Sequence, residues 1–127
     1  MILETTFVID LFRGKKDAVE KAEELDKRGE AVFTTTVTVF ELWQGLDAAT
    51  KDKREKLAHF IETFGLLPLD MEGAKHGGEI HRNLSLEGIR IDPEDSMIAG
   101  IAMRNAQPIL TKDEHFARIK GLRIETY

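Results

Sequence analysis

Residues 92–113, DPEDSMIAGIAMRNAQPILTKD, combine a helix signal with a strand signal. Asp92 is a typical N-cap residue and Pro93 fits the first helical position, so we expect a helix from 92 to about 105. The run 108–111 then predicts a short buried strand that ends shortly before Asp113. A helix followed at once by a buried strand is typical of a parallel sheet covered by helices.

The same alternation of helices and strands runs through the rest of the chain. Its 127 residues show no internal repeat or linker, so we expect one domain spanning residues 1–127. The predicted fold class is α/β, with a mostly parallel central sheet flanked by helices. The expected strands are 1–4, 31–34, 66–69, 108–111 and 122–125, and the expected helices are 7–13, 16–28, 36 or 38 to about 48, 51–64, 72–86, 92–105 and 114–119.

The composition excludes several classes of protein. With 42% hydrophobic and 32% charged residues, the chain is typical of a globular protein, and no apolar run reaches the roughly 18 residues of a membrane helix. The absence of cysteine rules out disulfides, thiolate zinc sites and thiol catalysis. The formal net charge of −5 argues against a nucleic-acid coat protein. Because the first residues lack the features of a signal peptide, we expect a cytoplasmic protein.

Four acidic residues stand in apolar surroundings, where a carboxylate is costly to bury unless it is paired or bound to a cation. Glu4 and Asp113 follow apolar runs, Glu41 lies inside one, and Asp95 opens an apolar helix. Because the carboxyl ends of parallel strands meet at one edge, Glu4, Asp95 and Asp113 should fall on the same side of the sheet. We therefore expect all four carboxyl groups to converge in one pocket and to bind a divalent metal ion for hydrolysis.

Each acid also has an ordinary explanation. Capping a helix accounts fully for Asp92, and Asp10 is interpreted as a supporting or surface residue. Glu4 could be a glutamate at a strand end that faces water, and the side chain of Glu41 could extend past Trp43 into solvent. Asp95 could be one of the acidic residues that favour a helix start. Asp113 could be a turn or N-cap residue, a role that is compatible with a place in the site.

Motifs for other kinds of chemistry are missing. The histidines lack the spacing of a zinc protease, and His115 is interpreted as a solvated loop residue. There is neither a phosphate-binding glycine loop nor a nucleophile serine motif. Two clusters of basic residues are typical of solvated surface, but where they lie beside the acids they could hold a polyanion. The first cluster is Arg13, Lys15 and Lys16, and the second is Lys112, Arg118, Lys120 and Arg123.

Four segments together resemble the motifs of PIN-domain proteins, especially the toxins of VapBC toxin–antitoxin pairs. These segments are MILETTFVIDLFRG (1–14), TVTVFELWQG (36–45), DSMIAG (95–100) and ILTKDEHF (109–116). They occur in the family's order over essentially the whole chain. Together the four are specific, although one alone would be weak.

The resemblance implies a metal-dependent ribonuclease with a compact α/β fold. The implied cofactor is Mg²⁺ or Mn²⁺, and the implied partners are an RNA substrate, a small antitoxin protein and a second copy of the chain. By motif position, the resemblance assigns catalytic and metal-binding roles to Glu4, Glu41, Asp95 and Asp113, with Thr111 as a supporting hydroxyl.

One residue departs from the family pattern, which places aspartate where this chain has Glu4. Glutamate keeps the charge but adds a methylene, and magnesium demands near-ideal geometry. The alternative function is therefore a catalytically impaired PIN-like domain that binds protein or RNA. A receiver-type phosphoryl-transfer domain is disfavoured, because it would need an aspartate as phosphate acceptor at the end of the first strand.

Overall fold

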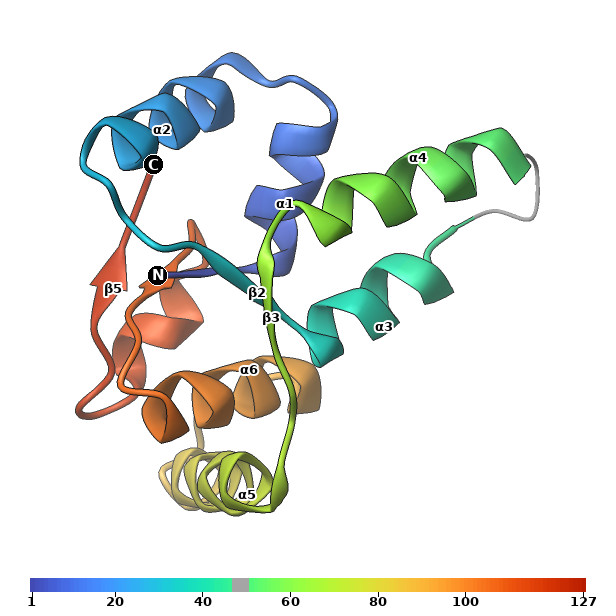
Figure 1. Ribbon diagram of the computed structural model, residues 1–127. Helices are drawn as coiled ribbons and strands as arrows, with labels where there is room; N and C mark the ends of the chain where they lie inside the picture. Colours follow the sequence, from blue (N-terminus) through green and yellow to red (C-terminus); the bar gives the residue numbers. More distant parts are fainter. Residues whose placement is uncertain (47–50) are drawn as a thin grey trace.

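Five short strands form the central sheet of the computed structural model, which describes residues 1–46 and 51–127. All neighbouring strands are parallel, so their carboxyl ends share one edge of the sheet (Figure 1). This arrangement confirms the predicted α/β class with a parallel sheet. Across the sheet the order is β3 (Gly65–Leu67), β2 (Phe33–Thr35), β1 (Ile2–Leu3), β4 (Ile109–Leu110) and β5 (Ile124–Glu125).

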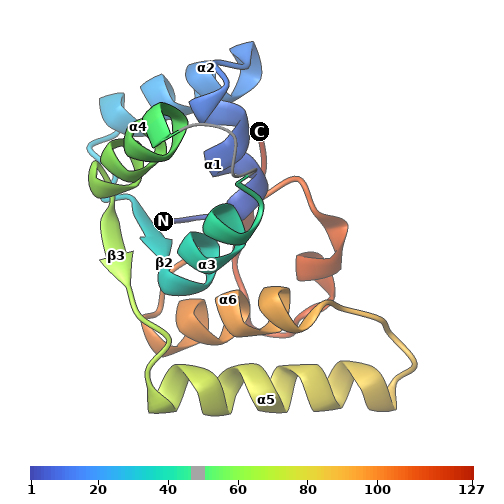
Figure 2. The same ribbon diagram turned by 90° about the vertical axis from the view of Figure 1, so that its right-hand side faces the viewer.

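Helices cover both faces of this sheet. One side carries α1 (Thr5–Phe12), α2 (Lys16–Lys27) and α4 (Lys51–Glu62), as Figures 1 and 2 show from two directions. The other side carries α5 (Met71–Leu86) and α6 (Pro93–Arg104), which lie against each other (Figure 2). Two further elements, α3 (Thr36–Gln44) and the 3₁₀ helix η1 (Glu114–Arg118), follow β2 and β4.

Most predicted boundaries agree with the structure to within a few residues, which is the usual uncertainty of helix and strand ends. The prediction that the helix beginning near residue 36 continues to about Ala48 differs, because α3 ends at Gln44 and Ala48 lies outside the described residues. None of the helices in the described ranges is long and apolar enough to cross a membrane.

The sheet separates two hydrophobic cores. Beneath α1, α2 and α4 the fully buried Phe7 packs with Leu3 and Leu110, whereas Ile98 of α6 packs with Ile2 and Ile109 on the opposite face. Successive residues of β1 and β4 thus enter different cores. Burial on both faces explains why these strands are continuously apolar instead of alternating.

Helices α5 and α6 cross at a contact made by glycines. An added Cβ at Gly100 would lie 2.3 Å from the carbonyl oxygen of Gly73 and 2.5 Å from the backbone nitrogen of Gly77. The two backbones therefore touch, and no larger residue fits between them. This contact explains why Gly77 stands inside a helix, although glycine disfavours helix interiors. It also fixes α6, whose first turn carries Asp95.

Candidate active site

Glu4 is held at the carboxyl edge by the pairing of β1 with β4. Its backbone nitrogen donates to the carbonyl oxygen of Leu110 at 3.1 Å, and the hydroxyl of Thr111 donates to Glu4 Oε2 at 3.3 Å. Glu4 is only 5% exposed. The strand-end glutamate therefore does not face water, and the hydroxyl of Thr111 is its hydrogen-bond partner.

Glu41 is held by a hydroxyl group from a neighbouring helix. Thr35 caps α3, its side chain accepting from the backbone nitrogen of Thr38 at 3.0 Å. Thr5, the first residue of α1, donates from its hydroxyl to Glu41 Oε1 at 2.7 Å and lies 3.0 Å from the hydroxyl of Thr38. These bonds turn the half-buried Glu41 toward the start of α1, and not outward past Trp43.

Asp95 and Asp113 line one cavity of about 360 Å³, together with Arg90, Asp92 and His115. Asp92 occupies the N-cap position of α6, as expected, but its side chain makes no capping hydrogen bond. Asp113 does cap η1. Its Oδ1 accepts from the backbone nitrogen of His115 at 2.9 Å and lies 2.6 Å from the Nδ1 of the same histidine. His115 is thus an exposed residue in contact with a site acid.

Burial and neighbouring negative charges raise the pKa of three of these carboxyl groups. Burial, followed by the negative charges of the other three site acids and Asp92, raises the pKa of Asp95 to about 7. Burial also raises the pKa of Glu4, and the charges of Glu41 and Asp113 add to this effect. The pKa of Glu41 is raised by burial, with smaller contributions from Glu94 and Asp92. The four acids therefore lie within one negative field at the carboxyl edge.

The cavities at this edge divide the four carboxyl groups, although the other three acids all act on the pKa of Asp95. Asp95 and Asp113 share a cavity, but Glu41 lines a different one with Leu42 and Leu57, and Glu4 is buried beneath the edge. Thr5 holds Glu41 on the side of α1, whereas His115, which contacts Asp113, lines the same cavity as Asp95. Within the described ranges, no three acidic or histidine side chains form a ready-made metal site.

The donor chemistry nevertheless fits a hard divalent cation. The candidate ligands are carboxylate oxygens, which suit Mg²⁺ and Mn²⁺ and not the softer metals that favour sulfur. Both hydrogen bonds to Asp113 use Oδ1, which leaves Oδ2 available as a ligand. A cation would also relieve the repulsion that raises the pKa of Asp95.

Two features of the surroundings were not predicted from sequence. Asp10, interpreted as a supporting or surface residue, is buried and accepts from the hydroxyl of Tyr127 at 2.8 Å. The sequence also does not show that the Thr5 hydroxyl donates to Glu41 and contacts the hydroxyl of Thr38, although the threonine-rich segments 5–6 and 34–38 are a possible signal. Both contacts depend on distant segments meeting in space.

The raised pKa of Asp95 predicts how metal-free stability depends on pH. Because the folded pKa of about 7 exceeds the ordinary value of 3.8, the folded state binds more protons between these values, and stability falls as pH rises through them. Asp95→Asn should reduce this fall by about 1–2 kcal/mol, after allowance for solvent screening at a half-buried site. Denaturant unfolding with EDTA at pH 5 and pH 8 measures the change.

The matched control for this prediction is Glu79→Gln, which removes one negative charge from an exposed position on α5. It should keep the pH dependence of the wild type. An Asp95→Asn variant that loses as much stability between pH 5 and pH 8 as the wild type would contradict the role given to Asp95.

Comparison with known proteins identifies the relatives of this chain. A family model described as PIN domain matches residues 1–122. Ribonuclease VapC5 of Mycobacterium tuberculosis is 34% identical over 110 residues, covering 82% of each chain. The tRNA(fMet)-specific endonuclease VapC of Salmonella typhimurium is 27% identical over 129 residues, covering 99% of this chain and 96% of that protein.

Solved structures agree with these sequence matches. The crystal structure of DNA-bound VapBC from Salmonella typhimurium superposes with a TM-score of 0.86 at 27% identity, covering 98% of this chain and 96% of that one. Similarity therefore extends across the whole sheet and its helices, including the elements that carry the four acids.

Proposed function

Because this chain belongs to the PIN-domain family, we propose that it is a metal-dependent endoribonuclease of the VapC type, which hydrolyses RNA phosphodiester bonds. The observation that carries the proposal is the group of four acids at the carboxyl edge, where burial, followed by the charges of Glu4, Asp113 and Glu41, raises the pKa of Asp95 to about 7. Structural acids are normally paired with cations or exposed to water. Acids kept together at a cost in stability are typical of functional sites.

The catalytic and metal-binding residues in this proposal are Glu4, Glu41, Asp95 and Asp113. Thr111 positions the carboxylate of Glu4 and Thr5 positions that of Glu41. A bound Mg²⁺ or Mn²⁺ supplies Lewis acidity toward the phosphate and lowers the pKa of water. The protein contributes fixed carboxylates, whose repulsion of RNA disappears once a cation neutralises them.

The partners proposed are RNA, a small antitoxin and a second copy of the chain. Solved relatives include complexes of the VapBC toxin–antitoxin type, among them the Salmonella typhimurium complex. An apolar groove of about 190 Å³ lies between α1, α3 and α4, lined by Phe12 and Leu57, and it ends at Glu41. An antitoxin segment bound there would lie beside a site acid. The proposed location is the cytoplasm.

Cleavage of a mixed set of labelled RNAs tests the function. The wild type should cleave RNA with Mn²⁺ or Mg²⁺ and lose all cleavage when EDTA is added. RNA binding without cleavage at any metal concentration would reject the enzyme and support a non-catalytic binding module instead. The binding module is not favoured, because the relatives that match are named ribonucleases and all four motif positions of this chain keep an acid.

Glu4→Asp tests whether the unusual glutamate is a ligand. If its extra methylene displaces the carboxylate from the metal, the shorter side chain should tighten Mg²⁺ binding and raise cleavage, by about the 10-fold to 100-fold typical of altered support of a metal ligand. If the site has adapted to glutamate, with Thr111 donating to it, cleavage should fall by a similar factor. Metal titration and cleavage rates of both proteins separate the two cases.

Glu4→Gln is the companion variant, because it keeps the length of the side chain and removes its charge. It should lower metal affinity in either case. If neither variant changes metal affinity or cleavage, Glu4 is not a ligand, and the assignment rests on the other three acids.

A further inference from the structure

Several basic side chains of the two sequence clusters have partners within the fold. Lys15 Nζ lies 2.9 Å from Asp10 Oδ1, and Lys112 pairs with Asp17 while its Nζ sits 4.1 Å from the ring centre of Tyr127. Arg123 donates to the carbonyl oxygen of Ala106 at 2.9 Å. The basic clusters of the sequence are therefore largely used within the fold.

Three exposed cations on the η1 side of the acids differ from this pattern, as do Arg13 and Lys53 on the side of Glu41. Arg90, Arg118 and Lys120 make no ion pair or hydrogen bond with any residue in the described ranges. Arg90 lines the same cavity as Asp95 and Asp113, and so it brings a fixed positive charge to the acid site. An unpaired arginine beside a carboxylate cluster is suited to hold a phosphate, because its planar fork matches two phosphate oxygens.

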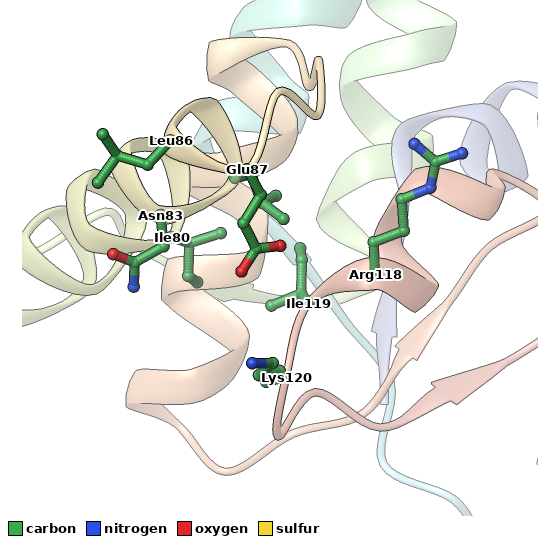
Figure 3. Close-up of a pocket in the computed structure, with 8 residues that line it drawn as sticks. Ile80, Asn83, Leu86, Glu87, Arg118, Ile119 and Lys120 are labelled. Carbon is green, nitrogen blue, oxygen red and sulfur yellow. The ribbon is translucent and has the colours of Figure 1, made fainter.

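The other two cations lie at a second cavity of about 310 Å³, between the end of α5 and the end of η1. Figure 3 shows Arg118 and Lys120 on opposite sides of Ile119, with Glu87 reaching in from α5. Ile80 and Leu84 contribute apolar surface to the lining. This cavity thus combines net positive charge with apolar surface, which suits the backbone and bases of an unpaired strand.

Helix η1 connects the two cavities. Its His115 lines the acid cavity, whereas Arg118 at its end lines the second one. A 3₁₀ helix rises about 2 Å per residue, so the three steps from His115 to Arg118 cover roughly 6 Å, and Ile119 and Lys120 continue beyond the helix. A few nucleotides of extended single strand can follow that path.

We propose that single-stranded RNA adjoining the cleaved bond binds along η1, with Arg90 holding a phosphate beside the acid site and Arg118 and Lys120 holding phosphates further along. This proposal rests on the proposed ribonuclease function and adds the path of the substrate. The other route from the acids is the groove that contains Arg13 and Lys53 beside Glu41. That groove is lined mainly by apolar side chains such as Phe12 and Leu57, so it is less suited to a charged backbone.

Binding of a fluorescein-labelled single-stranded RNA tests the path, measured by anisotropy at fixed Mg²⁺ over a range of KCl. All proteins carry Asp95→Asn, so that the RNA stays intact and any weakening of metal binding is the same in every variant compared. Adding Arg90→Gln, Arg118→Gln and Lys120→Gln should weaken binding roughly 100-fold at about 0.1 M salt, and should reduce the slope of log K against log salt by about 2, if three phosphate contacts are lost.

The matched control removes three positive charges elsewhere, by Lys27→Gln on α2, Lys56→Gln on α4 and Arg82→Gln on α5. It should change the affinity much less and leave the salt slope nearly unchanged. Equal losses in the two triple variants would overturn the proposed path. So would a loss confined to Arg13→Gln with Lys53→Gln, which would place the RNA in the apolar groove.

Failure of the path and failure of the ribonuclease function are distinguishable. If wild type cleaves RNA but the Arg90, Arg118 and Lys120 variant binds as the control does, only the path is wrong. If wild type cleaves no RNA with either metal, the proposed function fails whatever the binding data show.

Discussion

Asp95→Asn should lower the rate of metal-dependent RNA cleavage by at least about 10²–10³-fold, the loss seen when one group that stabilises transition-state charge is removed. The expected loss follows from the position of Asp95 at the start of α6, where it shares a cavity with Asp113 and feels the charges of Glu4 and Glu41. Asparagine keeps the size of the side chain but removes a negative charge that a divalent cation needs. Cleavage of labelled RNA under saturating Mn²⁺ measures the effect.

A second readout separates loss of metal from loss of structure. In wild type, saturating metal should raise the thermal midpoint, because the metal binds the acids only in the folded protein. At a metal concentration 100 times the dissociation constant, binding adds about 2.7 kcal/mol to the free energy of unfolding. In Asp95→Asn most of this shift should vanish, while the metal-free protein stays folded. The matched variant Glu79→Gln, exposed on α5, should keep both cleavage and the metal shift. Wild-type cleavage rates in Asp95→Asn would remove Asp95 from the site.

The edge of the sheet could be predicted from sequence because it follows from local patterns. Short apolar runs ending in Glu4 and preceding Asp113 indicate strands whose carboxyl ends meet, and the structure pairs β1 with β4 in that way. Asp95 follows from helical periodicity, since Ile98 and Ala102 on the same face are fully buried. Periodicity and topology are enough to place such residues on one side of a fold.

The detailed arrangement of the site could not be predicted in the same way. Glu41 accepts from Thr5, which lies 36 positions earlier in the chain, and it lines a different cavity from that of Asp95 and Asp113. Asp113 is drawn to His115 by two contacts that also cap η1. Side-chain hydrogen bonds of this kind depend on which segments meet in three dimensions, and no pattern within one segment encodes them.

The glycines of α5 show a related limit. Local propensity treats Gly77 and Gly78 alike, as two residues that weaken a helix. The structure separates them, because an added Cβ at Gly77 would lie 2.9 Å from the carbonyl oxygen of Ser96, whereas Gly78 has nothing within 4 Å. Only the crossing of α5 over α6 reveals that one glycine is required and the other is not.

Gly100→Ala should destabilise the fold by about 3 kcal/mol, at the upper end of the usual cost of overpacking. Its new methyl group would lie 2.3 Å from the Gly73 carbonyl oxygen and 2.8 Å from the Gly77 Cα, and both are backbone atoms that cannot rotate away. The two helices must therefore separate, and α6 carries Asp95 with it. Urea unfolding of the metal-free protein measures the loss.

Gly78→Ala provides the matched control, since it adds the same methyl group to the same helix pair. Its Cβ meets nothing within 4 Å, so the variant should gain the helix-interior advantage of alanine over glycine, about 0.5–1 kcal/mol. The two substitutions thus change stability in opposite directions for one reason, the presence or absence of a facing backbone. Equal effects of the two, or a Gly100→Ala variant as stable as wild type, would mean that α5 and α6 do not touch through their glycines.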